Sequence, residues 1–148
     1  MLPLKKNITK RLGELLIERK IISKDNLDKA LVIQKEKGGL IGEILVDLGF
    51  AKEEDIAQAL TAQYGFPFLP LANYEIEPEV IKSIPENVCS QYCIMPVDRI
   101  GDSLTLAMSN PLNNSAIEDV EEVTKCSVQI FVSTTSDIRK AIAKYYKK

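Results

Sequence analysis

The stretch RLGELLIERKIISKDNLDKALVIQ, residues 11–34, decides the fold, because a second copy of it, LIGEILVDLGFAKEEDIAQALTAQ, follows at residues 40–63. Six identical pairs lie 29 positions apart: Gly13 and Gly42, Glu14 and Glu43, Leu16 and Leu45, Ala30 and Ala59, Leu31 and Leu60, and Gln34 and Gln63. Other positions keep their character, as in Leu12/Ile41 and Leu27/Ile56. A repeat of this length is one supersecondary unit stacked on its twin.

Apolar residues recur at helical spacing in both copies, so each copy predicts two helices. Asn7 or Thr9 can cap the first helix, and Ser23 can cap the second. The expected helices span about residues 10–18, 24–35, 41–48 and 52–64. Residues 1–65 are therefore predicted to form a tandem repeat of two helical hairpins.

The second unit is expected at residues 66–148, beyond a proline-rich bridge that holds Pro67 and Pro70. Phe66, Phe68 and Leu69 predict an extended segment laid on the helical unit. Further on we expect helices at 78–84 and 86–92, strands at 94–97, 104–108 and 128–132, and helices at 116–125 and 137–146, the last capped by Ser136. The predicted fold class is α+β: a four-helix tandem repeat followed by a small α/β unit with about three strands.

Composition narrows the class of protein. The chain has 148 residues, of which 45% are hydrophobic, enough for a modest core. Its 19 basic and 21 acidic residues are interspersed, which argues against a DNA or RNA partner bound through phosphates. Neither a signal peptide nor a membrane-spanning run is recognisable, so a cytoplasmic protein is expected.

Catalytic and metal-binding patterns are missing from the sequence. No glycine precedes a lysine as in a P-loop, the chain has no His, and no serine lies in a G-x-S-x-G elbow. Cys89, Cys93 and Cys126 lack the spacing of a zinc or redox site, so they are expected to be buried free thiols. We therefore expect neither an enzyme nor a bound metal or cofactor.

Three polar features have competing interpretations. The basic chain ends could approach an anion or a membrane, or they could be solvated termini. The acidic runs 53–55 and 118–119 are interpreted as solvated helix faces. The turn at 109–111, Ser-Asn-Pro, could offer amides to an anion, or it could simply connect a strand to a helix.

Some repeated residues are not types that a helix requires. Gly13 and Gly42 recur although glycine costs a helix about 1 kcal/mol, which suggests close approach of a ligand or of a packed neighbour. Gln34 and Gln63 could bind a ligand or lie on a solvated face. Arg11 opens the first copy, and its guanidinium could stack on a base or pair with a phosphate.

At these residues the chain resembles the MshEN-type tandem motif in the N-terminal domain of the assembly ATPases of type II secretion and type IV pili. The residues that carry the likeness are Arg11-Leu12-Gly13, Leu16-Ile17, Ile21-Ile22, Leu27, Ala30-Leu31 and Gln34, with Ile41-Gly42, Leu45-Val46, Gly49, Ile56, Ala59-Leu60 and Gln63 in the second copy. The second half agrees through Ile94–Val97, Leu104–Met108, Asn110-Pro111, Ile138, Ala141-Ile142 and Tyr145-Tyr146.

The resemblance implies a noncatalytic regulatory and docking domain in the cytoplasm, peripheral to the inner membrane through its partners. Those partners would be an inner-membrane platform protein and a C-terminal ATPase domain of the same polypeptide. In members that bind cyclic di-GMP, the ligand lies along the tandem motif. The corresponding residues here are Arg11, Leu12, Gly13, Leu16, Gln34, Ile41, Gly42, Leu45 and Gln63.

Two departures from the motif each affect one copy. Leu40 stands where the first copy has Arg11, and Lys20 stands where the second copy has Gly49. The second copy therefore lacks a guanidinium. If that group made a charged hydrogen bond to the ligand, its absence would weaken the binding free energy by about 1 to 3 kcal/mol. Lys20 could supply another cation nearby, without the fork of an arginine. The alternative function is a docking adaptor that binds no nucleotide.

Overall fold

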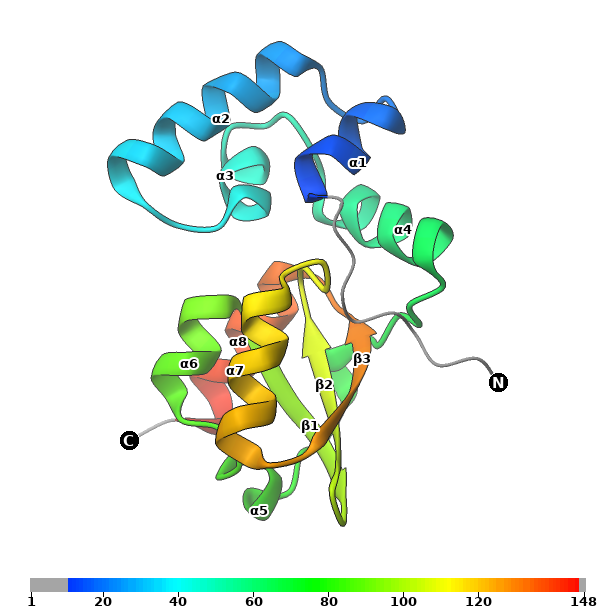
Figure 1. Cartoon of the computed structure of the whole chain (residues 1–148), viewed down its shortest axis with the longest axis vertical. Coiled ribbons are helices and arrows are strands. Elements are labelled where there is room, and N and C mark those ends of the chain that lie inside the picture. The colour runs from blue at the N-terminus through cyan, green and yellow to red at the C-terminus, as the bar shows by residue number, and fades with distance from the viewer. Residues whose placement is uncertain (1–10, 147–148) are drawn as a thin grey trace.

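The computed structural model describes residues 11–146, without the side chain of Asn73, as a helical unit followed by an α/β unit (Figure 1). The helical unit contains α1 (Leu12–Glu18), α2 (Lys24–Lys37), α3 (Ile41–Asp47) and α4 (Glu53–Tyr64). The α/β unit contains η1 (Leu71–Asn73), α5 (Pro78–Ile81), α6 (Glu86–Tyr92), β1 (Ile94–Ile100), β2 (Ser103–Met108), α7 (Asn114–Thr124), β3 (Ser127–Val132) and α8 (Thr135–Tyr145). The predicted α+β fold class is confirmed.

The sequence duplication is visible in the backbone. In each copy the second residue after a short helix has a positive φ, Lys20 at +61° and Gly49 at +80°. Each of these residues donates its backbone N–H to a helical carbonyl at 2.9 Å, Ile17 in copy one and Val46 in copy two. The second copy keeps the residue that suits this left-handed turn, whereas Lys20 adopts it against the preference of an L side chain.

Side-chain capping fixes the start of α2 as predicted. The hydroxyl of Ser23 accepts the backbone N–H of Asn26 at 3.1 Å, and the Asn26 carboxamide oxygen accepts the N–H of Ser23 at 3.0 Å. Arg11 occupies the N-cap position of α1, and no side chain among the described residues caps that helix. Asn7 and Thr9, the predicted caps, lie outside the described residues.

The predicted cap of α8 is wrong by two residues. Thr134 caps this helix, because its side-chain oxygen accepts the backbone N–H of Asp137 at 3.3 Å. Ser136 lies inside the first turn instead and donates its hydroxyl to Glu53 of α4 at 2.8 Å. A cap must precede the helix in extended backbone, and Thr134 has that conformation.

The three strands form one sheet in the order β1-β2-β3. β1 and β2 are antiparallel, with a bulge between Pro96 and Asp98, while β2 and β3 are parallel and are connected by α7. The extended segment after α4 pairs with the end of β3: Val132 donates its N–H to Pro67 and accepts that of Leu69. This segment therefore pairs with the edge of the sheet, and it also lies beside the helical unit, because Phe68 lines a cavity with Ala57 and Thr61 of α4.

Buried side chains form a continuous core through both units. In the helical unit Leu16 and Leu45 occupy matching repeat positions, and both are fully buried. All three cysteines are buried and free, as expected. Among residues 11–146, no helix has the length and apolar character that crossing a lipid bilayer requires.

Candidate functional site

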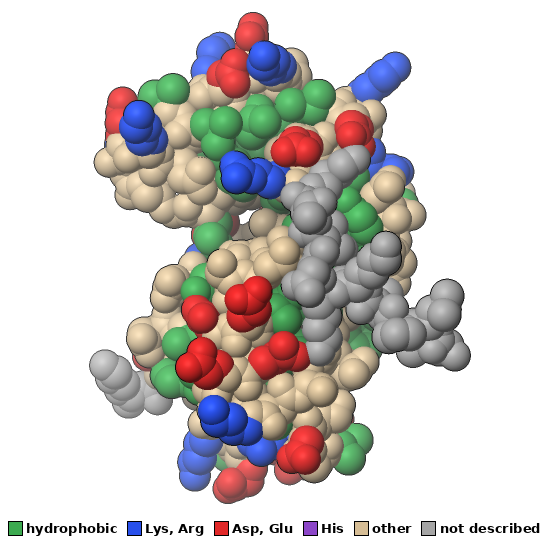
Figure 2. All heavy atoms as spheres, in the orientation of Figure 1, with side chains coloured by type: hydrophobic (Ala, Val, Ile, Leu, Met, Phe, Trp, Pro, Cys, Tyr) green, Lys and Arg blue, Asp and Glu red, His purple; other side chains and the backbone are tan. Residues whose placement is uncertain are grey.

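The surface is hollowed where the helical unit meets the α/β unit (Figure 2). A larger cavity of about 380 Å³ lies between α1, α2 and the loop before α7. A smaller cavity of about 130 Å³ lies between α3, the start of α4 and the loop after β3. The two cavities share Leu12, Gln34, Ile41, Asn110 and Asn113. Because they are contiguous, we call them together the groove.

The larger cavity has mainly apolar walls. Leu12, Leu27, Leu31 and Ile41 come from the helical unit, and Leu112 comes from the loop before α7. Leu31 remains 42% exposed, so part of the wall faces solvent. Hydrophobic walls with a few polar groups are typical of small-molecule sites, and they can hold the flat face of an aromatic ring.

Polar side chains border the larger cavity. Arg11 is exposed at the N-cap of α1, and Glu14 lies in the first turn of the same helix. Gln34, near the end of α2, donates its side-chain N–H to the carbonyl of Gly39 at 3.0 Å. This hydrogen bond orients the carboxamide and leaves its oxygen as an acceptor for a ligand.

Two asparagines from the α/β unit complete the groove. The carboxamide oxygen of Asn110 accepts the N–H of the second residue after it at 3.1 Å, and that of Asn113 accepts an N–H in the first turn of α7 at 3.3 Å. Because both oxygens have internal partners, each asparagine offers its NH₂ group as a donor. The sequence drew attention to the turn containing Asn110 but missed Asn113, which its position before α7 could have marked as a cap.

Two carboxylates line the smaller cavity and hold α8. Glu43 accepts hydrogen bonds from Nε and a terminal nitrogen of Arg139 at 3.1 and 2.6 Å, and Arg139 also donates to the Ser90 carbonyl at 2.6 Å. The hydrogen bond to Glu43 raises the pKa of Arg139. Glu53 accepts the backbone N–H and the hydroxyl of Ser136 at 2.6 and 2.8 Å.

The acidic runs are thus only partly the solvated faces that the sequence predicted. Glu54 and Asp55 are exposed, but Glu53 bonds to α8 because the start of α4 abuts that helix. Asp119 and Glu118 are both exposed, but Asp119 also accepts a hydrogen bond from the hydroxyl of Tyr92. A run of like charge does not reveal which member faces a neighbouring element.

The groove brings together six of the residues that the motif resemblance implies. They are Arg11, Leu12, Gly13, Gln34, Ile41 and Gly42. The other three lie elsewhere: Leu16 and Leu45 are fully buried in the core, and Gln63 is exposed at the end of α4, outside the groove. A ligand-binding role for each of the nine stays a prediction.

The repeated glycines pack closely against leucines. A Cβ atom on Gly13 would lie 2.7 Å from one Leu27 methyl and 2.9 Å from the other. A Cβ atom on Gly42 would lie 3.3 Å from a Leu12 methyl. Helix packing therefore accounts for Gly13 without a ligand, although both glycines also border the groove.

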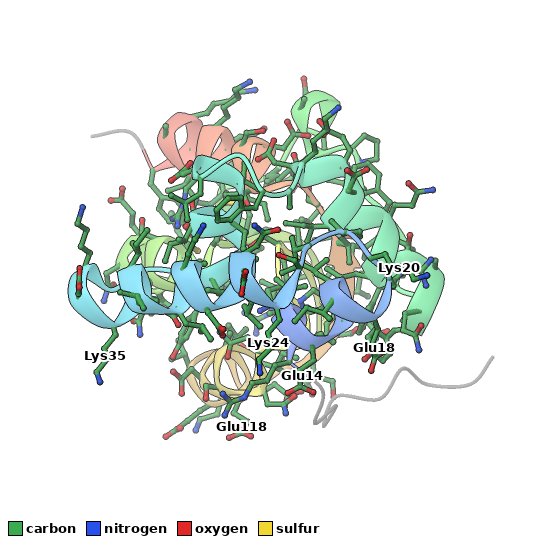
Figure 3. All side chains as sticks on the ribbon, turned by 90° about the horizontal axis from the view of Figure 1, so that it is seen from above. Glu14, Glu18, Lys20, Lys24, Lys35 and Glu118 are labelled. Atoms are coloured by element: carbon green, nitrogen blue, oxygen red, sulfur yellow. The ribbon has the colours of Figure 1, made fainter. Side chains whose placement is uncertain are left out.

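The two departures from the motif have different structural consequences. Leu40 is the N-cap of α3, as Arg11 is of α1, and it lines the smaller cavity. Lys20 lies beyond the far end of α1, away from Glu14 (Figure 3). It is exposed and outside the groove, so it does not replace the missing guanidinium there.

A comparison with protein families settles the relationship that the tandem motif suggested. The MshEN domain model matches residues 64–148. The chain belongs to the MshEN domain family. The match covers the α/β half and the last residue of α4, whereas the tandem motif lies in the helical repeat, so both halves of the chain support the same family.

Relatives of this MshEN domain include secretion and pilus ATPases. The type IV pilus assembly ATPase PilB of Myxococcus xanthus is 38% identical over 92% of the chain, and PilB of Thermus thermophilus is 32% identical over 93%. Type II secretion system protein E of Xanthomonas campestris is 26% identical over 92%. The chain spans 24%, 16% and 25% of these relatives, respectively.

Solved structures agree with the fold. The structure of MshE with cdg superposes with a TM-score of 0.67 at 28% identity, covering 93% of this chain and 99% of the other. The N-terminal domain of XpsE superposes with a TM-score of 0.73, covering 97% and 99%. At 23% identity the XpsE likeness supports the fold alone.

Proposed function

We propose that this MshEN domain is the noncatalytic N-terminal regulatory and docking domain of a type II secretion or type IV pilus assembly ATPase, and that its groove binds cyclic di-GMP. The observation that carries the proposal is the convergence of motif residues from both copies, among them Arg11, Gln34 and Ile41, on one groove. The structural likeness to MshE, which was solved with cdg, supports the choice of ligand.

The chemistry of the groove suits a cyclic dinucleotide. Its apolar walls can pack against a guanine ring, on which the Arg11 guanidinium can stack. The NH₂ groups of Asn110 and Asn113 can donate to the acceptor atoms of guanine or to phosphodiester oxygens. Arg139 offsets the charge of Glu43, which reduces repulsion of the two phosphodiesters.

Calorimetric titration of the chain with cyclic di-GMP, with GTP as a control ligand, tests this proposal. Micromolar affinity corresponds to about -8 kcal/mol. Arg11→Ala should weaken binding by tenfold or more, because a hydrogen bond to a charged group contributes about 1.5 to 3 kcal/mol. Gln34→Ala should weaken binding by about threefold or more, because a hydrogen bond between neutral groups contributes about 0.5 to 1.5 kcal/mol.

Gln129→Ala is the matched control, since Gln129 is exposed on β3 and lies outside the groove. It should bind as tightly as the unmodified chain. No heat of binding from a folded chain, or equal losses in the two glutamine variants, would reject the proposed site.

A docking function is the second candidate. Leu31 and Val32 are adjacent on α2 and are 42% and 56% exposed, an apolar pair that a partner could cover. The partners we propose are the inner-membrane platform protein and the ATPase domain of the same polypeptide, which would keep the protein cytoplasmic and peripheral to that membrane. Val32→Glu should reduce co-purification with the platform protein, whereas Val123→Glu, at a 51% exposed site on α7, should not.

A further inference from the structure

The contact between the two units includes two hydrogen-bonded pairs that also form a wall of the groove. One joins Glu43 of α3 to Arg139 of α8, and the other joins Glu53 of α4 to Ser136 of α8. Both glutamates line the smaller cavity. We call these two pairs the α8 latch.

The latch holds Glu43 and Glu53 of the second motif copy against α8 of the α/β unit. Arg139 bridges α3 to α6, because it binds Glu43 and the Ser90 carbonyl at the same time. Side-chain exposure is 35% for Arg139 and 26% for Glu43, so the pair is partly shielded from water. The first-copy counterpart of Glu43 is Glu14, which is exposed beside the larger cavity.

Loss of the latch would change the groove in two ways. Without Arg139 the Glu43 carboxylate would be a partly buried, uncompensated charge, and it would repel a ligand that carries two phosphodiester anions. Without these two contacts, α3 and the start of α4 would lose the polar contacts that hold them beside the smaller cavity. Both effects act on the second-copy side of the groove. There Leu40, rather than an arginine, occupies the N-cap of α3.

We propose that Arg139 and Ser136 are positioning residues, which hold Glu43 and Glu53 so that the second motif copy keeps the geometry that binds the dinucleotide. This inference rests on the proposed function. Ligand binding and the contact between the units are then linked, and the linkage is reciprocal. If forming the latch increases the affinity for the ligand by some factor, the bound ligand increases the equilibrium constant for forming the latch by the same factor.

Calorimetry with cyclic di-GMP on Arg139→Gln, Glu43→Gln and the double variant tests the inference. Arg139→Gln should weaken binding by fivefold or more, the lower end of typical coupling between sites. Glu43→Gln should weaken it less, because it breaks the pair without leaving a carboxylate that repels the phosphodiesters. The double variant should lose no more affinity than Arg139→Gln alone, because both changes break one pair. Arg139→Lys restores the charge but not the fork, so it should recover part of the affinity.

Arg99→Gln is the charge-matched control, since Arg99 is exposed on β1 and donates to Gly101 within its own hairpin. It should bind like the unmodified chain. Ser136→Ala provides a milder test if Arg139→Gln fails to fold, because it removes the 2.8 Å hydroxyl bond and keeps the backbone donor. It should weaken binding by about twofold or more.

Hydrogen exchange supplies the reciprocal readout. Cyclic di-GMP should slow exchange of the amides in the first turn of α8 in the unmodified chain, and this protection should disappear in Arg139→Gln. If the unmodified chain binds but the folded latch variants bind equally well, the inference is overturned and the proposed function stands. If the unmodified chain does not bind, the proposed function fails, and the inference fails with it.

Discussion

Alkaline pH should destabilise this domain through the buried thiol of Cys89. The Cys89 sulfur lies 3.3 Å from the hydroxyl of Tyr146 in the core between α6 and the end of α8. Burial raises the pKa of Cys89 from its ordinary 9.0 to about 11, and the hydrogen bond with Tyr146 offsets only part of this rise. The folded chain therefore favours the neutral thiol.

The sign and size of the effect follow from proton linkage. Because the folded pKa is raised, the unfolded chain loses this proton first, and the stability that the thiol contributes is fully present below pH 9. That contribution falls as pH rises from about 9 to 11 and is lost above the folded pKa. A shift of two pKa units corresponds to about 2.7 kcal/mol, of which about 1.4 kcal/mol is lost at pH 10.

Urea unfolding at pH 8 and pH 10 in a reducing buffer measures this loss, with Cys89→Ala as the perturbation. The variant should be less stable at both pH values because of its cavity, but its loss between them should be smaller by about 1.4 kcal/mol. Cys126→Ala is the matched control at another buried cysteine, and it should retain the full alkaline loss. An identical pH dependence for Cys89→Ala and the unmodified chain would refute the reasoning.

Four further substitutions test the helical unit by urea unfolding. Gly13→Ala should cost about 1 to 2 kcal/mol, because overpacking against Leu27 outweighs the gain in helix propensity, whereas Gly42→Ala, with a 3.3 Å contact, should be nearly neutral; the opposite order would contradict the packing account. Lys20→Gly should raise the free energy of unfolding by about 0.5 to 1 kcal/mol, because glycine adopts the positive φ without strain. An unchanged urea midpoint would show that Lys20 is not strained there. Leu45→Ala should cost about 2 to 5 kcal/mol, since Leu45 is fully buried, and a loss below 1 kcal/mol would show that the site is less tightly packed.

The helices and strands could be predicted from the sequence because their signals are local. The 29-residue offset between Gly13 and Gly42 identified the duplication, and Ser23 marked the start of α2 correctly. The cap of α8 was misplaced because Thr134 and Ser136 are both good cap residues, and local preference does not separate them. The choice depends on a contact across the molecule, that of Ser136 with Glu53.

The groove could be predicted only in part, for a similar reason. Motif residues such as Arg11 and Gln34 were found in the helical repeat, since a repeat can be read along the chain. Asn113 and the pairing of Glu43 with Arg139 could not be found, because they depend on how the α/β unit docks against α3. A sequence repeat predicts which residues are equivalent but not which of them the rest of the fold covers.

That distinction has a consequence for how a duplicated motif works. Gln34 and Gln63 are identical by sequence, yet one borders the groove and the other is exposed outside it. Glu14 and Glu43 are also identical, yet one is exposed and the other is paired with α8. The α/β unit therefore breaks the symmetry of the repeat, because its helix α8 binds a residue of the second copy, Glu43. A dinucleotide with two similar halves would meet two unlike half-sites, so equivalent substitutions in the two copies should have unequal effects on its binding.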